Sequence, residues 1–426
     1  MSVSQLGLIL VVACIVAIIS RRLQLPYSVG LVAAGVCLAL FGGSIKVTLP
    51  PDLIYTVLLP PLIFEAALNL KWKPFRNNLP VTVALAFPGV LATGAIITIG
   101  MHGIIGWSWL GSALFGALIA ATDPVSVITA FKEMNVEKRL SLLVESESLL
   151  NDGTAAVAFA ILVSIAQGTG IEIAGVAGSL AWMVIGGITV GTLVAGATLL
   201  VAGRTDDHLV EITLTTIAAY GSFLLAERFH MSGVLAALAA GLVIGNVGLA
   251  GGLRFSITES SRSHVISFWD YAAFLANSVV FILIGGYEAG QAAQFFTPAA
   301  AIAIVLVLIG RVAAVYPLCA AFARSPLKVD MRHQHVLVWG GLRGALALAL
   351  ALAIPASVPE KSAIVVASFA VVAFSIFAQG LTMPWFIRRL GLIQKAESEG
   401  GGDDASPSPA PSGIKSQSSK IDQFLS

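Results

Sequence analysis

Apolar runs of about 20 residues follow one another along most of this chain, and short polar turns separate them. A helix needs about 20 residues of this kind to cross the hydrocarbon core of a bilayer. The pattern therefore predicts an all-α polytopic membrane protein with about 13 transmembrane helices. The first run has no basic region before it and no cleavage site after it, so we expect a retained helix.

Composition supports this class and excludes others. Hydrophobic residues make up 57% of the chain and charged residues only 11%, whereas a soluble domain has about 25% charged residues. The net charge of +1 argues against a nucleic-acid partner. The three cysteines all lie in apolar runs without ligand spacing, so they predict neither a disulfide framework nor a metal centre.

Gly and Pro interrupt several runs, so the expected boundaries are approximate. The predicted spans cover residues 4–20, 27–43, 52–70, 79–101, 108–131, 141–166, 172–200, 208–226, 231–249, 268–286, 298–323, 334–356 and 362–389. We expect residues 1–390 to form one membrane domain. Residues 391–426 are rich in Gly, Ser, Pro and Asp, and they predict a disordered cytoplasmic tail.

The basic residues between spans indicate the orientation. With Arg21 and Arg22 placed in the cytoplasm, fourteen Lys and Arg residues fall in cytoplasmic loops and three in the opposite loops. The bias predicts an outside N-terminus and a cytoplasmic C-terminus. The other cytoplasmic residues are Lys71, Lys73, Arg76, Lys132, Lys138, Arg139, Arg204, Arg254, Arg262, Arg324, Lys328 and Arg332, and the opposite ones are Lys46, Arg228 and Lys361.

An odd number of spans allows two inverted six-helix repeats, helices 1–6 and 8–13, on either side of a linking helix 7. Transporters with such repeats have their sites where corresponding helices are broken. Helix 5 carries Thr122-Asp123-Pro124 in mid-span, and helix 12 carries Gly340-Gly341-Leu342-Arg343-Gly344. The sequence thus predicts broken crossing helices 5 and 12.

Helix 6 carries the polar stretch ESESLLNDG, residues 145–153. Counted from Ser141 at about 1.5 Å per residue, Asp152 lies about 16 Å deep, near the middle of the bilayer. Asp123, Arg311 and Arg343 reach a similar depth, and Glu65 on helix 3 lies somewhat nearer the cytoplasm. Ionisable residues at this depth are costly and indicate a functional site.

Helical spacing assigns these residues to different faces. Ser148 and Asp152 share a face, with Glu145 further along the cytoplasmic approach. A carboxylate, hydroxyls and a carbonyl freed by a helix break form a hard oxygen site suited to Na⁺ or Li⁺, and less selectively K⁺. We therefore expect Asp152, Thr122, Ser148 and Glu65 to bind the cation.

A second group of charges has a structural interpretation. Glu147 lies on the adjacent face with Asn151, and Arg311 is its candidate partner in a buried ion pair. Asp123 and Arg343 are expected to compensate the partial charges of the broken helix ends.

The motifs ATDP, ESLLND and GGLRGALALALAL, with LIFEAAL and the mid-helix Arg311, resemble the monovalent cation:proton antiporter family that includes bacterial NhaP and animal Na⁺/H⁺ exchangers. The resemblance implies a homodimer in which a core bundle, helices 4–6 and 11–13, moves against a dimer domain, helices 1–3 and 7–10. It implies that Asp152 is the essential ion and proton carboxylate, preceded by Asn151. It also implies that Thr122, Ser148 and Glu65 line the ion site, that Asp123 belongs to the crossing, and that Glu147 pairs with Arg311. Asn151-Asp152 resembles the branch regarded as electroneutral.

The predicted function is therefore exchange of Na⁺ or Li⁺ for H⁺ across the plasma or bacterial inner membrane, without a cofactor. K⁺/H⁺ or Ca²⁺/H⁺ exchange on the same fold is the alternative, and a cation channel is a remote one. A membrane enzyme is disfavoured because the histidines are expected in loops or at span ends. Among them, His333 and His335 are predicted to lie in a solvated loop.

Overall fold

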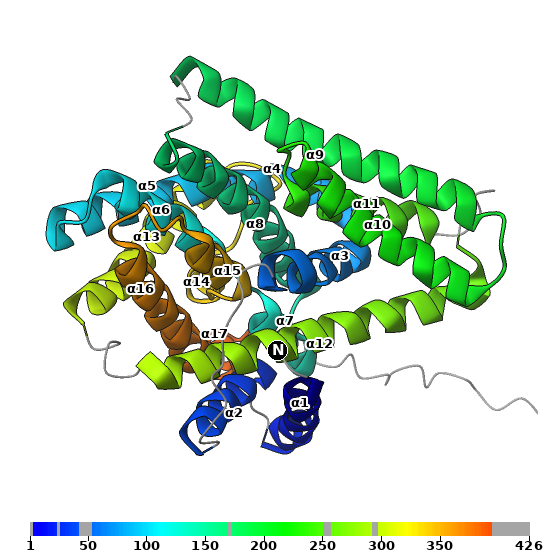
Figure 1. Ribbon diagram of the computed structural model, residues 1–426, viewed down its shortest axis with the longest axis horizontal. Helices are drawn as coiled ribbons and strands as arrows, with labels where there is room; N and C mark the ends of the chain where they lie inside the picture. The colour runs from blue at the N-terminus through cyan, green and yellow to red at the C-terminus, as the bar shows by residue number, and fades with distance from the viewer. Residues whose placement is uncertain are drawn as a thin grey trace, which may run out of the picture. The chain divides into compact units, whose positions relative to one another are not determined.

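The computed structural model describes residues 3–23, 26–41, 53–168, 173–249, 257–291 and 297–393, and these residues are mainly helical (Figure 1). Where this part of the chain is extended, its one recorded pairing is an isolated bridge between Val136 and Ile393. The predicted tail lies outside the described residues from 394 onward. The α-helices and π-helical turns (η) are α1 (Val3–Leu23), α2 (Tyr27–Phe41), η1 (Leu53–Leu58), α3 (Leu59–Asn69), α4 (Trp72–Ala86), α5 (Pro88–Gly100), η2 (Met101–Ile105), α6 (Trp109–Ala120), α7 (Val125–Met134), α8 (Lys138–Ala166), α9 (Ile173–Ala202), α10 (His208–Arg228), α11 (Gly233–Val243), η3 (Ile244–Gly248), α12 (Glu259–Gln291), α13 (Pro298–Ala321), α14 (Met331–Trp339), α15 (Ala345–Ala353), α16 (Lys361–Phe374), η5 (Ser375–Gly380) and α17 (Leu381–Leu390).

Each predicted span coincides with one or more of these helices. Seven helical runs in the described chain are long and apolar enough to cross a bilayer, and shorter apolar helices accompany them. Some helices extend beyond the apolar window: α12 begins at Glu259 instead of residue 268, and α4 begins at Trp72 instead of residue 79. The polar residues at these ends continue the backbone hydrogen bonding of the helix although they add nothing to its apolar length.

Both predicted breaks are present. Helix α6 ends at Ala120 and α7 begins at Val125, while α14 ends at Trp339 and α15 begins at Ala345. Pro124 has no N–H to donate to the preceding turn, which stops α6 from continuing. At the other break the chain passes very close to Asp123, because a Cβ on Gly344 would overlap the Asp123 carboxylate. Glycine is therefore required at that position.

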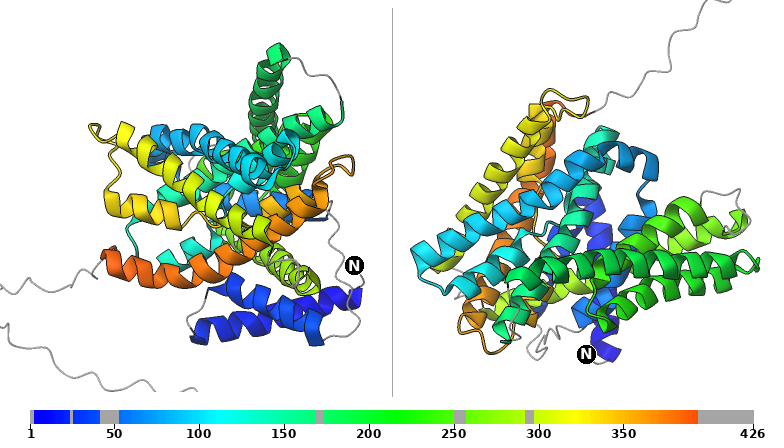
Figure 2. Two further views of the ribbon diagram at one scale, coloured as in Figure 1. Left: turned by 90° about the vertical axis from the view of Figure 1, so that its left-hand side faces the viewer. Right: turned by 90° about the horizontal axis from the view of Figure 1, so that it is seen from above.

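The helices pack in two recognisable sets (Figures 1 and 2). In one set, α9, α10 and α11 pack together, α3 packs on α11 and α12, and α12 lies along α2. In the other, α5 packs on α6 and α13, α4 packs on α8, and α15 and α13 pack on α16. Helix α8 packs on α4 and α6, which precede it in the chain, and also contacts α15, which follows it.

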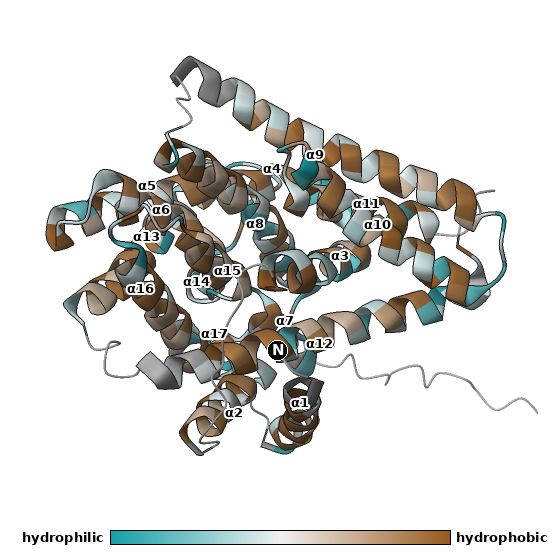
Figure 3. Ribbon diagram, in the orientation of Figure 1, coloured by the Kyte–Doolittle hydropathy of each residue, from teal (hydrophilic) through white to brown (hydrophobic). Residues whose placement is uncertain are grey.

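Apolar residues cover much of the outside of these helices, and polar residues gather at helix ends and loops (Figure 3). Ile185 and Leu193 on α9 and Leu209 on α10 are each more than 60% exposed. Exposed apolar patches on this scale are typical of surfaces that contact lipid. The chain is a multi-pass membrane protein.

Candidate functional site

The two helix breaks are joined by backbone and side-chain hydrogen bonds. The N–H of Asp123 donates to the carbonyl of Leu342 at 2.8 Å. The Nη1 atom of Arg343 donates to the carbonyls of Ala120 and Ala121, each at 2.7 Å. These are the carbonyls left without helical partners where α6 ends, so Arg343 places a positive charge at the negative end of that helix.

Asp123 lies at the opposite kind of helix end. Its Oδ1 atom accepts a hydrogen bond from the N–H of Val125 at 3.0 Å, at the start of α7. Its carboxylate also lies against Gly344, immediately before α15. The negative charge thus faces the positive N-terminal ends of two half-helices.

Asp152 is the middle residue of the long helix α8, Lys138–Ala166. Its Oδ1 atom is buried and has no hydrogen-bond partner within the described part of the protein. A buried carboxylate oxygen without a partner is energetically unfavourable. The arrangement leaves Asp152 ready to bind a proton or a cation.

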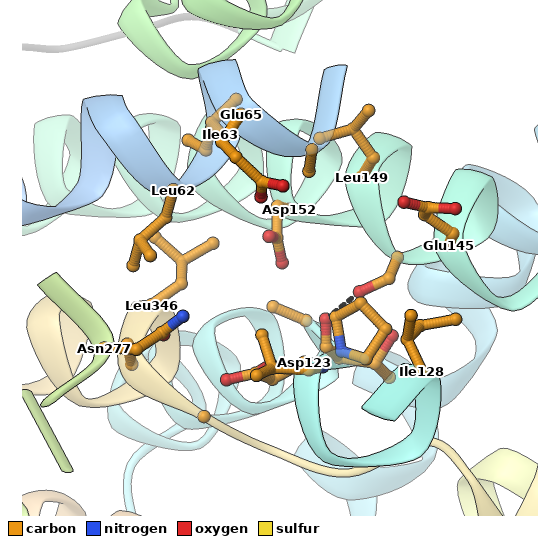
Figure 4. A pocket seen from close by; sticks show the side chains of 18 of the residues that line it. Leu62, Ile63, Glu65, Asp123, Ile128, Glu145, Leu149, Asp152, Asn277 and Leu346 are labelled. Carbon is orange, nitrogen blue, oxygen red and sulfur yellow. Dashed lines mark hydrogen bonds between the residues drawn. The ribbon is translucent and has the colours of Figure 1, made fainter. Parts of the chain in front are cut away.

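Asp152 faces a cavity of about 190 Å³ (Figure 4). Helices α3 and α12 form one side of this cavity, which we call the α3–α12 wall. The break after α6, with α7, α8 and α15, forms the other side, which we call the α7–α8–α15 wall. Figure 4 shows Glu65 on α3 beside Asp152 on α8, with the Asp152 carboxylate directed into the space.

Thr122, in the break after α6, is held by α8 at three atoms. Its N–H donates to Asn151 Oδ1 at 3.1 Å, and its hydroxyl accepts from Asn151 Nδ2 at 2.6 Å. Its carbonyl accepts a hydrogen bond from the hydroxyl of Ser148. Thr122 and Ser148 therefore keep their oxygens close to Asp152, where they could bind a cation.

Glu147 and Arg311 form a bidentate ion pair away from the cavity. The distances are 2.8 Å from Arg311 Nη1 to Glu147 Oε1 and 2.7 Å from Nη2 to Oε2. Both side chains are buried, and Arg311 also donates to the carbonyl of Leu337. Asn151 donates to Glu147 Oε1 at 3.0 Å, which links the ion pair to Thr122.

The structure thus divides the predicted site residues into two groups. The cavity is lined by Glu65, Thr122, Asp123, Glu145, Ser148 and Asp152. The lining residues do not include Asn151, Glu147, Arg311 or Arg343, although the sequence predicts Asn151 as an ion-binding residue. Its amide faces Thr122 and Glu147 because it occupies the face of α8 next to that of Asp152.

Sequence reasoning missed three polar residues of the cavity: Asn277 on α12 and Thr129 and Lys132 on α7. Asn277 interrupts a long apolar run, and that isolated carboxamide was the available signal. In the described chain, no group of three or more His, Cys, Asp or Glu side chains is placed to hold a metal ion.

The prediction for the two histidines is wrong. His333 and His335 lie in α14, which begins at Met331. His333 is 4% exposed, and its Nε2 atom is 3.1 Å from Glu137 Oε2. His335 Nδ1 is 2.6 Å from the hydroxyl of Tyr316. The polar sequence resembled a loop, but these partners allow the His333 side chain to be buried and the His335 side chain to be partly buried.

Two helices broken at a shared crossing, beside the carboxylate in the middle of α8 whose Oδ1 atom has no partner in the described chain, define a membrane transporter of the inverted-repeat class. A family model described as "Sodium/hydrogen exchanger, transmembrane" matches residues 9–389. The chain belongs to this family, which is a family of transporters, and the resemblance found in the sequence is confirmed.

Individual relatives agree with this assignment. The chain is 35% identical to the Na⁺/H⁺ antiporter NhaS2 of Synechocystis sp., over 92% of this chain and 71% of the relative. It is 38% identical to the Na⁺/H⁺ antiporter ApNhaP of Aphanothece halophytica, over 87% and 70%. The solved structure of the sodium proton antiporter MjNhaP1 from Methanocaldococcus jannaschii matches with a TM-score of 0.74 and 20% identity, over 92% of this chain and 99% of that one. The last match confirms the fold.

Proposed function

We propose that this chain exchanges Na⁺ or Li⁺ for H⁺ across its membrane, with Asp152 holding either the proton or the cation. The observation that carries the proposal is the buried Asp152 Oδ1 atom, which has no partner in the described chain and faces a cavity beside the two helix breaks. The names of the relatives as Na⁺/H⁺ antiporters support Na⁺ as the cation.

Competition at one carboxylate produces the coupling. A protonated Asp152 is neutral and has little attraction for a cation, whereas an ionised Asp152 attracts one. Thr122 and Ser148 would supply neutral oxygens, and Glu65 would supply an oxygen from the opposite wall. Glu147 is paired with Arg311 and does not line the cavity, so it is not offered to the cation. We propose that Asp152 is the one carboxylate that exchanges its proton during the cycle, which makes the exchange one cation for one proton and electroneutral.

Alternating access follows from the position of the cavity between two sets of helices. We propose that predicted helices 4–6 and 11–13, which correspond to α4–α8 and α13–α17, move as a core bundle. They would move against a dimer domain of predicted helices 1–3 and 7–10, which correspond to α1–α3 and α9–α12. The α7–α8–α15 wall belongs to the core bundle and the α3–α12 wall to the dimer domain. Movement of one wall along the other would expose Asp152 to each side in turn.

The basic residues of the loops support an outside N-terminus and a cytoplasmic C-terminus in a plasma or bacterial inner membrane. We further propose a homodimer formed through the helices of the dimer domain, α1–α3 and α9–α12. Their exposed apolar faces, which include α9 and α10, would be shared between lipid and the second subunit.

Asp152→Asn tests the proposal. Asparagine has nearly the same shape but neither titrates nor carries charge, so we expect Na⁺-dependent proton movement in everted vesicles to fall at least about 100-fold. Asp206→Asn, in the exposed turn before α10, is the matched control and should behave like the wild type.

Substantial Na⁺-dependent proton movement by Asp152→Asn would exclude Asp152 as the shared carboxylate. Parallel assays with Na⁺, Li⁺, K⁺ and Ca²⁺ would identify the cation. An ion current without proton movement would favour a channel over an exchanger.

A further inference from the structure

The cavity has two ends that differ chemically (Figure 4). Glu145 lies at one end, seven residues before Asp152 on α8 and thus about 10 Å from it along the helix. At the other end lie Asn277, Leu62 and Leu346, with Asp152 between the two ends. The cavity therefore continues past Asp152, away from Glu145.

Of the three residues labelled at that far end, Leu62, Leu346 and Asn277, Asn277 is the polar one. Figure 4 shows the carboxamide nitrogen of Asn277 directed into the space, beside the apolar side chains of Leu62 and Leu346, and a half-turn of the carboxamide would present its oxygen there instead. Within the described part of the chain, no hydrogen bond occupies this carboxamide. The adjacent Ser278, by contrast, donates to the carbonyl of Phe274 and is bonded to the Tyr27 hydroxyl.

An unpartnered carboxamide that lines a cavity, as Asn277 does, is free to bind a polar occupant of that cavity. The carboxamide oxygen is a hard, neutral ligand of the kind that binds Na⁺ and Li⁺. Because it has no charge, it can hold a partly dehydrated cation without competing with Asp152 for protons. Its position on α12 places it on the wall opposite Asp152.

We propose that Asn277 is a specificity-determining residue of cation exchange, whose carboxamide oxygen binds the cation beyond Asp152, from the α3–α12 wall. This inference rests on the proposed exchange function. Asp152 would select between proton and cation, and Asn277 would contribute to selection among cations. The smaller Li⁺ and the larger Na⁺ would depend on this oxygen to different degrees, because it approaches from a fixed opposite wall.

The test uses the full chain in proteoliposomes with Na⁺ and Li⁺ concentration series at one pH. We expect Asn277→Ala to raise the half-saturating Na⁺ concentration about three- to tenfold and to change the Na⁺/Li⁺ ratio, because one oxygen ligand is lost. The maximal rate should remain near that of the wild type. Asn277→Gln, which keeps the oxygen on a longer side chain, should retain more of the wild-type affinity than Asn277→Ala. Ser278→Ala is the matched control on the same helix and should leave both half-saturating concentrations unchanged.

Unchanged half-saturating concentrations for both ions in Asn277→Ala would overturn the inference. So would a lower maximal rate at unchanged affinity, since that result assigns Asn277 to the movement of the walls. Equal effects of Asn277→Ala and Asn277→Gln would also contradict an oxygen ligand. Thermal unfolding of each variant in detergent identifies any variant that fails to fold. An active Asp152→Asn variant would instead contradict the underlying exchange function.

Discussion

Asn151 connects two parts of α8 that have different chemistry. Its amide oxygen and nitrogen bind the backbone and hydroxyl of Thr122, and the same nitrogen reaches Glu147. The buried ion pair of Glu147 and Arg311 is thereby joined to Thr122, a proposed cation ligand, without lining the cavity. A substitution of Glu147 or Arg311 can therefore shift Thr122 through one side chain, that of Asn151.

Glu147→Gln should reduce the amount and stability of the folded protein. The change leaves the buried Arg311 guanidinium without its counter-charge, and such losses cost about 3–5 kcal/mol. Thermal unfolding in detergent would measure the decrease. Replacing both residues, as Glu147→Gln with Arg311→Gln, should recover part of the stability because no uncompensated charge then remains. A normally stable Glu147→Gln protein without transport would argue for a direct role in the ion cycle.

Several of these residues could be placed from the sequence because polar side chains in mid-membrane have few suitable partners. Glu147 needs a positive charge at its own depth, and Arg311 provides it. Asn277 could not be placed in this way, since a single carboxamide in an apolar helix fits many environments. Nor could the sequence show that Asn151 faces Thr122, because that depends on how the break after α6 rests on α8.

At the scale of elements, each broken helix provides hydrogen-bond partners for the other. The bond from Asp123 N–H to Leu342 carbonyl ties one break to the other, and Arg343 binds the last carbonyls of α6. Pro124 and the glycines of 340–344 were enough to predict where the helices break. The pairing itself uses backbone atoms, which every residue possesses, so no side-chain pattern could have revealed it.

The N-terminal end of α6 offers a test of how firmly this helix is held. Glu360, just before α16, accepts a hydrogen bond from the N–H of Ser108 at 2.9 Å. Ser108 is the N-cap of α6, and its hydroxyl accepts from Gly111 N–H. Burial raises the pKa of Glu360, but the hydrogen bonds from Ser108 outweigh this effect and hold the pKa below its usual value.

Glu360→Gln should therefore lower the melting temperature slightly at neutral pH, by about 1–2 °C, because a negative charge at a helix N-terminus is lost. A depressed carboxyl pKa stabilises the fold above the unfolded pKa of about 4.3 and loses that effect as pH falls through the folded value. The difference between variant and wild type should thus narrow below about pH 4. The measurement is the melting temperature of detergent-solubilised wild type and variant at neutral pH and below about pH 4. If the difference in melting temperature stayed the same at both, the effect would come from side-chain packing and not from the charge.

At the scale of the whole molecule, the cavity lies between two walls whose helices come from different sets. The length and number of the apolar runs predicted the helices, and the breaks predicted the crossing. The cavity was harder to foresee, because its volume depends on how side chains from α3, α12 and α15 meet. Only its most polar residues carried a signal in the sequence.

Linking the two walls should stop transport. Leu62 on α3 and Leu346 on α15 line the cavity from opposite sides, so cysteines at both positions can be joined by a short cleavable thiol reagent. Cys14, Cys37 and Cys319 must first be replaced. We expect exchange to fall to the background level after linking and to return after cleavage, because the walls can no longer move past each other.

A pair of cysteines at Leu59 and Leu62 provides the matched control, since both positions belong to α3 and the link does not join the walls. Exchange by this pair should survive the reagent. Full activity of the linked Leu62 and Leu346 pair would rule out relative movement of these walls as part of the cycle.

The hydrogen bonds between the two breaks decide which ligands would stay with the cation during the proposed movement. Because Thr122, Ser148 and Asp152 are held to one another by the crossing and by α8, they would travel together as one rigid body. Glu65, on the α3–α12 wall, would not travel with them. The cation would therefore keep three of its proposed ligands and leave the others behind, so its affinity can differ between the two sides of the membrane while the gradients of cation and proton still set the direction of exchange.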